Sequence, residues 1–319
     1  MRGDPKPARL TVLYRGPLAS CDQHCPYCPL PTRRDPPDAL RADRDALARF
    51  VGWASSAPVA ELSVFVTPWG EALVRRWYRE ALATLSHLPG VRRVAIQTNL
   101  SARVDWVADA DPGRLALWCT YHPGEVEAER FLRRTRTLRR HGVRFSVGVV
   151  ALPGHLDAAR WLRSQLPGGV YLWANAAEGR SYTPGEEAAW TALDPLFGYS
   201  VRPHRSQGAS CRTGEDVVSV AGDGTVRRCH FVAAPIGNLY DGSYCAGLRP
   251  RPCPNRMCDC HIGYVHLRTL PLTEVFAGGV LERIPAGWSP SPTEGDTSTG
   301  RTVTGTAPVR SWRLPSSSR

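Results

Sequence analysis

Three cysteines fall within eight residues near the amino terminus, in the stretch CDQHCPYC (21–28). Cys21, Cys25 and Cys28 are spaced C-x3-C-x2-C and directly follow ARLTVLY, an apolar stretch that predicts a strand. A structural zinc site normally closes with four ligands. A [4Fe–4S] cluster has four irons, so three thiolates leave one iron free for a ligand from outside the protein. The loop therefore predicts an iron–sulfur site with an open position, and zinc binding is the alternative.

Polar residues also follow the second and third predicted strands. TPWGEAL places Gly70 and Glu71 after one of them, and QTNLS places Thr98 and Asn99 after the other. In parallel α/β folds the carboxyl ends of the strands meet at the edge where active sites are built. We expect the Glu71 carboxylate to accept hydrogen bonds from the ammonium group of a ligand. Tyr27, between two of the cysteines, is expected to shield the cluster and pack on an adenine ring.

A second group of cysteines lies in the last third of the chain. SCRTGEDVVSVAGDGTVRRC sets Cys211 and Cys229 around a predicted hairpin with Gly224 at its turn. Further cysteines follow downstream, at Cys253, Cys258 and Cys260. Thiols brought together by a hairpin and a later loop can complete a metal site. Cys119 and Cys245 join neither group, and we interpret both as free buried cysteines.

The first group of motifs resembles that of radical S-adenosylmethionine (radical SAM) enzymes, with CDQHCPYC as the signature. WGEAL corresponds to the family's Gly-Gly-Glu motif, with Trp69 in place of the first glycine. The resemblance spans residues 9 to about 200. It implies a partial (β/α)6 barrel and a [4Fe–4S] cluster on Cys21, Cys25 and Cys28 that binds S-adenosylmethionine (SAM). The cofactor contacts that we assign on this basis are Tyr27, Gly70, Glu71, Thr98, Asn99 and His122, the last of which has a plain loop histidine as its alternative.

The second group is similar to the SPASM and twitch extensions of that family, which carry auxiliary [4Fe–4S] clusters. The downstream C-x4-C-x-C departs from the full SPASM pattern, so we expect a single, twitch-like auxiliary cluster. Cys211 and Cys229 are expected as two ligands, and the others come from Cys253, Cys258 and Cys260. His261 is an alternative ligand, and a structural zinc ribbon is the alternative to the cluster.

The resemblance implies an enzyme of the radical SAM oxidoreductase or maturase type. Such an enzyme cleaves SAM reductively and abstracts hydrogen with a 5′-deoxyadenosyl radical. We expect a peptide, protein or small-molecule substrate, with peptide or protein maturation favoured, and a reductant such as flavodoxin or ferredoxin. No further catalytic side chain is assigned. The rival hypothesis is a zinc-binding interaction protein that contacts nucleic acid, but it leaves WGEAL and QTN at the strand ends unexplained.

The elements that must position these residues alternate along the chain. The expected strands are 9–14, 61–67, 92–98, 114–121, 143–152 and 169–175, and the expected helices are 39–55, 71–87, 103–109, 125–141, 156–166 and 183–197. Strands that are apolar nearly throughout and separated by helices predict a parallel sheet covered on its outer face. The predicted fold class is α/β, a partial TIM-like barrel followed by a small cysteine-rich hairpin domain. The expected domains are 1–200 and 205–270, with a disordered tail at 287–319 that is rich in Ser, Thr, Pro and Gly.

The net charge of +11 raises the question of a nucleic-acid partner. Lys6 is the only lysine, and the basic run 129–142 keeps apolar residues at helical spacing, which indicates a solvated basic face. We therefore expect no nucleic-acid partner. No apolar run approaches the roughly 18 residues of a membrane span. The apolar run before Arg15 is too short for a secretory signal, so we expect a cytoplasmic protein without a membrane partner.

Overall fold

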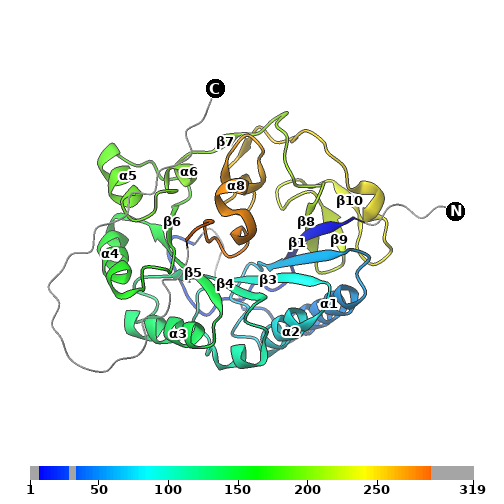
Figure 1. The fold of residues 1–319 in the computed structure, drawn as a ribbon, viewed down its shortest axis with the longest axis horizontal. Coiled ribbons are helices and arrows are strands. Elements are labelled where there is room, and N and C mark those ends of the chain that lie inside the picture. The colour runs from blue at the N-terminus through cyan, green and yellow to red at the C-terminus, as the bar shows by residue number, and fades with distance from the viewer. Residues whose placement is uncertain (1–6, 29–33, 289–319) are drawn as a thin grey trace.

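The computed structural model describes residues 7–28 and 34–288 as one curved sheet with helices outside it and a carboxyl-terminal segment inside it (Figure 1). The sheet order is β10-β9-β8-β1-β2-β3-β4-β5-β6. Its strands are β1 (Arg9–Arg15), β2 (Glu61–Val66), β3 (Val91–Thr98), β4 (Leu115–Tyr121), β5 (Arg144–Ala151), β6 (Leu172–Ala176), β8 (Val217–Ala221), β9 (Thr225–Arg227) and β10 (Pro235–Asn238). Strands β1 to β6 run parallel in sequence order, so the α/β class and the mostly parallel sheet are confirmed. The sheet ends at β10 and β6 and does not close into a barrel.

The helices that cover the outer face lie where periodicity predicted them. They are α1 (Pro37–Ser55), α2 (Arg76–His87), α3 (Ala128–Arg140), α4 (Leu156–Gln165) and α5 (Pro184–Thr191), with a 3-10 turn at Asp105–Asp109. The second helix begins five residues later than predicted, because Glu71 and the residues after it form a loop at the end of β2. The last predicted helix, 183–197, is shorter and ends at Thr191.

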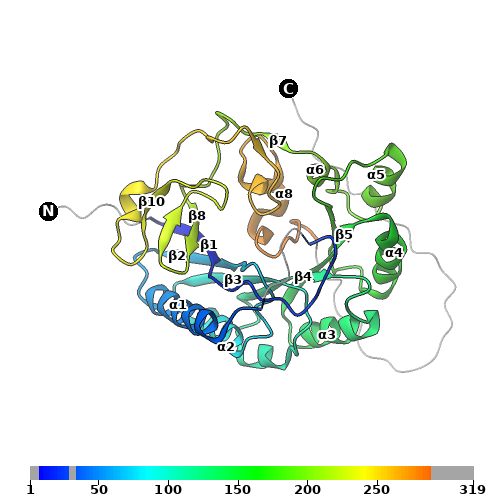
Figure 2. The same ribbon diagram turned by 180° about the vertical axis from the view of Figure 1, so that it is seen from behind.

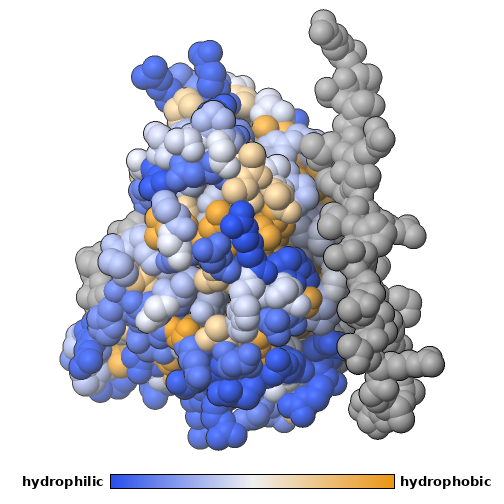
Figure 3. Space-filling model, turned by 90° about the vertical axis from the view of Figure 1, so that its left-hand side faces the viewer, coloured by the Kyte–Doolittle hydropathy of each residue, from blue (hydrophilic) through white to orange (hydrophobic). Residues whose placement is uncertain are grey.

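One side of each strand packs against these helices. Leu10, Val12 and Tyr14 of β1 share a buried cluster with Phe50 of α1 and Leu82 of α2. In α3, the apolar residues are buried and most of the arginines are exposed, as the basic run predicted. The face of the molecule drawn in Figure 3 is correspondingly hydrophilic over most of its area.

The other side of the sheet encloses the carboxyl-terminal segment. Residues Leu13, Phe65 and Trp118 form a second buried cluster with Leu272 and Phe276 of α8 (Leu272–Phe276). Figures 1 and 2 both show α8 within the curve of the sheet. The core therefore has two layers: helices against the outer face, and one short carboxyl-terminal segment against the inner face.

The predicted hairpin joins the main sheet and does not form a sheet of its own. Strand β8 pairs in parallel with β1, and β9 returns antiparallel to β8 after a turn at Gly224, whose φ is +86°. This pairing could not be predicted, because partners as far apart in the chain as Thr11 and Val217 leave no local pattern. A separate two-stranded ladder joins β7 (His204–Arg205) to β11 (Met257–Cys258). Of the predicted tail, residues 289–319 lie outside the described part of the chain.

No helix in residues 7–28 and 34–288 combines the length and the apolar character needed to cross a bilayer.

Candidate functional site

The three-cysteine loop leaves the carboxyl end of β1 and is anchored there by two aspartates. The Asp43 carboxylate, buried on α1, accepts hydrogen bonds from the Leu18 amide at 3.1 Å and from the Tyr78 hydroxyl at 2.8 Å. Asp35 accepts from the amide and the hydroxyl of Ser20 at 2.8 and 2.7 Å. Burial acts to raise the pKa of Asp35, but the hydrogen bonds from Ser20 and Ala19 hold it below its usual value. The chain just before Cys21 is thus fixed to α1 and to the start of that helix.

The loop after β2 lies directly against the loop after β1. The amides of Trp69 and Glu71 donate to the carbonyls of Leu18 and Ser20 at 3.1 and 3.0 Å. A Cβ at Gly70 would lie 1.9 Å from the Ser20 carbonyl oxygen. Only glycine allows this approach, which places the retained glycine of the WGEAL motif beside the cysteine loop.

The Glu71 carboxylate is buried and turned toward the protein. One oxygen accepts from the Leu73 amide at 2.9 Å and the Thr98 hydroxyl at 2.8 Å, and the other accepts from the Asn99 amide at 2.6 Å. Burial raises its pKa to about 7, and the bonds from Asn99, Thr98 and Leu73 oppose that rise. Glu71 therefore joins the ends of β2 and β3. Both carboxylate oxygens thus already accept hydrogen bonds from the protein. The expected contact with the ammonium group of a ligand stays a prediction.

Asn99 extends from the end of β3 back to the cysteine loop. Its side-chain amide lies 3.1 Å from Asp22 Oδ1 and 4.0 Å from Cys21 Sγ. The Asn99 Oδ1 accepts from the Ser101 amide at 2.8 Å, so the amide group cannot rotate freely. The polar residues that follow β2 and β3 thus meet the cysteine loop, as expected from a parallel sheet.

The thiols of Cys21 and Cys25 lie close enough to their neighbours in the loop for those neighbours to affect their pKa values. Burial raises the pKa of Cys21, and nearby Glu71, Asp22 and Cys28 raise it further. Burial also raises the pKa of Cys25 to about 11, with contributions from Glu125, Cys28 and Cys21. Thiols in such a setting stay protonated at neutral pH unless a cation displaces the protons. The donor set therefore suits a positively charged metal group.

An aromatic group flanks the loop on the side of β4 and β5. The Tyr27 hydroxyl lies 2.9 Å from His122 Nδ1, and the His155 ring meets the Tyr27 ring edge-on at 5.0 Å. Glu125 accepts from the His24 amide at 2.9 Å. Tyr27 contacts these two histidines, and its packing on adenine stays a prediction. Figure 2 shows the segment after β1, in dark blue, running toward β5.

A second pocket gathers the later cysteines around Leu13 of β1. Its wall includes Cys211, Cys229, Cys253, Cys258 and Cys260. Burial raises the pKa of Cys258 to about 12, and the charges of Cys260, Cys229 and Cys211 contribute to that rise. The structure thus brings together all five of the cysteines that the sequence analysis assigned to this group.

The backbone explains how distant cysteines meet. The Cys253 amide donates to the Ala209 carbonyl at 2.9 Å, and β11 places Cys258 opposite His204 of β7. The Gly263 amide donates to the Cys260 carbonyl at 2.8 Å, closing a tight turn at the end of the group. The first two contacts join the segment 253–263 to the segment that precedes Cys211.

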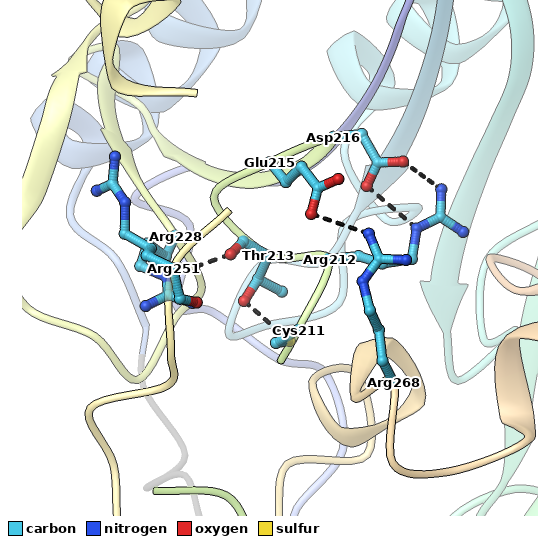
Figure 4. A network of polar contacts seen from close by, with 8 residues as sticks. All are labelled: Cys211, Arg212, Thr213, Glu215, Asp216, Arg228, Arg251 and Arg268. Carbon is cyan, nitrogen blue, oxygen red and sulfur yellow. Dashed lines mark hydrogen bonds and ion pairs between the residues drawn. The ribbon is translucent and has the colours of Figure 1, made fainter. Parts of the chain in front are cut away.

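Arginines stabilise the loop after Cys211 (Figure 4). Arg228 is buried, and its guanidinium donates to the carbonyls of Thr213 and Arg251 at 3.2 and 2.8 Å. The Thr213 hydroxyl lies 3.2 Å from Cys211 Sγ. Arg268 pairs with Glu215 at 2.9 Å on the other side of the loop. This network holds Cys211 at the pocket wall.

Three residues considered from the sequence lie outside the pocket. Cys119 is fully buried in β4, as expected, and Cys245 is partly buried on α7 (Tyr244–Gly247). His261 lines an inner cavity with Trp118 and Arg283, and is not part of the cysteine-lined wall.

Sequence reasoning missed a histidine that does line the cysteine pocket. His230 follows Cys229 directly, and its Nδ1 lies 2.7 Å from the Ser219 hydroxyl. Burial, assisted by the positive charge of Arg15, lowers its pKa to about 3, so the ring is neutral. Its place beside Cys229 was the only available signal.

In the described part of the chain, no three His, Cys, Asp or Glu side chains are close enough to share one metal ion. The thiolates of a [4Fe–4S] cluster bind different irons, so its ligands surround a larger group than a single ion.

No protein-family model matches this chain, and neither does any curated protein. Among solved structures, anSMEcpe with bound S-adenosylmethionine (AdoMet) aligns with 73% of this chain and 79% of its own, with a TM-score of 0.50 and 13% identity. BtrN in complex with AdoMet and 2-DOIA covers 73% of this chain and 80% of its own at a TM-score of 0.35 and 15% identity. Streptococcus suis SuiB bound to S-adenosylmethionine covers 75% and 63%, at a TM-score of 0.35 and 11% identity.

The first of these comparisons shows a shared fold. The fold is the one expected from the sequence in its coarser features: an α/β chain with a large, mostly parallel and unclosed sheet, similar to that of an AdoMet-bound protein.

Proposed function

We propose that this protein is a radical SAM enzyme that cleaves S-adenosylmethionine at a [4Fe–4S] cluster held by Cys21, Cys25 and Cys28. It then abstracts hydrogen from a peptide, protein or small-metabolite substrate, with peptide or protein maturation favoured. One observation carries the proposal: the three-thiol loop lies at the carboxyl end of β1, against Gly70 and the buried Glu71–Asn99 pair. A fold shared with AdoMet-bound anSMEcpe supports it.

The bound cluster and SAM would supply the electron-transfer and radical chemistry, as cofactors generally do. The residues of this chain would position those groups and keep water away. Asp35 and Asp43 fix the entry of the loop, and Glu71 joins the strand ends beneath it. Tyr27 closes the flank toward β4 and β5.

We further propose that the cysteine-lined pocket binds one auxiliary [4Fe–4S] cluster. Five thiols line it, which is one more than four irons require. Both cysteine groups lie near the carboxyl end of β1, since the loop of Cys21 leaves this strand and Leu13 lines the second pocket. A substrate between them would be close to both.

The test is anaerobic reconstitution followed by iron and sulfide counts, EPR and a SAM-cleavage assay under reducing conditions. We expect about eight irons in the wild type and about four in a Cys21/Cys25/Cys28→Ala variant. The wild type should form 5′-deoxyadenosine and methionine, and the triple variant should form neither. Cys245→Ala is the matched control, because this thiol belongs to neither group and its loss should change nothing.

Stoichiometric zinc without iron would overturn the proposal in favour of the zinc-binding hypothesis. Four irons in the wild type and none in the triple variant would overturn only the auxiliary cluster. Iron at full count without 5′-deoxyadenosine would overturn the radical SAM assignment. If the wild type does cleave SAM, a loss of mass or a new cross-link in a peptide encoded by a neighbouring gene would identify the substrate class.

A further inference from the structure

His230 presents an unsatisfied nitrogen in the cysteine-lined pocket. Its Nδ1 is held by Ser219 of β8 at 2.7 Å, while its Nε2 is buried and has no hydrogen-bond partner among the described residues. Buried polar atoms are nearly always paired, so an atom without a partner needs explanation. A neutral imidazole carries one N–H, and if the Ser219 hydroxyl donates to Nδ1, that N–H is on Nε2. The pocket then contains a donor fixed in direction and without an acceptor.

Arg15, at the end of β1, adds a positive charge to the same region. Its guanidinium lies 3.9 Å from the centre of the Trp69 ring, and its Nε donates to the Thr67 carbonyl at 3.0 Å. No ion pair joins Arg15 to a carboxylate in the part of the chain that the structure describes. Arg15 lies two residues after Leu13 on β1, so both side chains are on the same face of the sheet, and Leu13 lines the cysteine pocket. A largely buried cation without a carboxylate partner favours an anionic group nearby.

Trp69 explains part of this arrangement. It stands where the resembling family has a glycine, and a glycine offers no ring on which a guanidinium can stack. Trp69 therefore helps the Thr67 carbonyl to hold Arg15 in place, which gives this departure a structural role.

We propose that His230 and Arg15 tune the reduction potential of the group bound by the cysteine-lined pocket. His230 donates a hydrogen bond from Nε2 to a sulfur of that group, and Arg15 balances its negative charge. This inference rests on the auxiliary cluster of the proposed function. Hydrogen bonds to sulfur and nearby positive charge both favour the reduced, more negative state and so raise the potential.

The test uses the full chain with Cys21, Cys25 and Cys28 replaced by Ala, so that one cluster is measured alone. EPR-monitored redox titration compares three variants. His230→Phe removes the hydrogen-bond donor, Ser219→Ala removes the hydroxyl that positions it, and Arg15→Met removes the positive charge. We expect His230→Phe and Arg15→Met each to weaken electron binding about tenfold, which lowers the reduction potential by about 59 mV for a one-electron couple. The iron content should not change. Ser219→Ala should give a smaller shift, and Arg15→Lys should restore most of the wild-type value.

The controls are His141→Phe and Arg139→Met, at the exposed end of α3, which should leave the potential unchanged. An exchangeable proton coupled to the cluster should be detected by ENDOR in H2O and be lost in His230→Phe. A strong nitrogen coupling with loss of iron in His230→Phe would overturn the proposal by making His230 a ligand.

An unchanged potential at full iron content would also overturn the tuning proposal. If the Cys21/Cys25/Cys28→Ala chain binds no iron, both the tuning proposal and the auxiliary cluster are overturned. In contrast, shifted potentials alongside a wild type that cannot cleave SAM would leave this inference standing and overturn the radical SAM assignment alone.

Discussion

Gly70 controls how closely two loops approach each other at the first site. Its Cα lies so near the Ser20 carbonyl that any side chain would overlap the backbone of the cysteine loop. The amides on either side of it, Trp69 and Glu71, both donate into that loop. A change at this position therefore acts on the cysteines through the backbone, without touching a thiol.

We predict that Gly70→Ala separates the two loops and lowers iron binding at the first site. A Cβ 1.9 Å from backbone oxygen forces a shift that a flexible side chain cannot absorb. Iron content should fall toward that of the triple cysteine variant, while thermal unfolding stays cooperative. Gly52→Ala, in the open on α1, is the control and should stabilise the protein by about 0.5–1 kcal/mol. Full iron content and SAM cleavage in Gly70→Ala would show that the loop contact is dispensable.

At the residue scale, spacing alone identified the groups of cysteines, because each group keeps its thiols in short segments. The directions of other side chains could not be predicted from the sequence. Glu71 reads as a ligand-facing carboxylate, yet the amides of Leu73 and Asn99 turn it inward. His261 was considered as an alternative ligand, but it lines the inner cavity, and His230 lines the cysteine pocket instead.

At the element scale, β5 and β6 show how two neighbouring strands divide the space inside the sheet. Gly148 of β5 pairs with Trp173 of β6, and a Cβ on Gly148 would lie 2.0 Å from the Trp173 ring. The ring lies over the glycine and donates from Nε1 to the Ser146 hydroxyl at 3.0 Å. The absence of a side chain on one strand thus makes room for the largest side chain of the next.

We predict that Gly148→Ala destabilises the fold by about 1–3 kcal/mol, the usual cost of overpacking a core. The extra methyl would push Trp173 away from Ser146, so its fluorescence should change as well. Urea unfolding measures the first effect, and Gly185→Ala, in open space on α5, is the control. If the two variants unfold at the same urea concentration, the Trp173 packing contributes no stability.

The six parallel strands and the helices between them were predictable, because alternating apolar and amphipathic stretches report local structure. The pairing of β8 with β1 was not, because 217–221 carries the same apolar pattern whether it forms a separate hairpin or extends the main sheet. The difference matters for the site. By joining β1, the hairpin carries Cys229 and His230 to the strand from which the first cysteine loop departs.

At the scale of the whole molecule, the carboxyl-terminal segment completes the interior of the sheet. Glu282 follows α8 closely and is fully buried, at 0% exposure. Its carboxylate accepts from Arg144 of β5 at 3.0 Å and lies 3.7 Å from Arg93 of β3, while its own carbonyl accepts from the Ser146 hydroxyl at 2.6 Å. One residue near the end of the described chain thus joins two strands of the sheet at the edge opposite the cysteines.

We predict that Glu282→Gln destabilises the protein by roughly 3 kcal/mol, because it leaves two arginines without their shared buried partner. The amide keeps the shape of the carboxylate, so the loss reports charge and not packing. Urea unfolding compares it with Glu274→Gln, an exposed glutamate on α8 whose change should have little effect.

The same comparison decides whether the inner segment is part of the folded core or only lies against it. If it is part of the core, Glu282→Gln should lower the midpoint of one cooperative transition and loosen both cysteine groups together, since the segment packs on Leu13 beneath them. Early proteolytic release of residues after 263, with the sheet and the iron content of both sites unchanged, would instead mean that the segment is not part of the folded core.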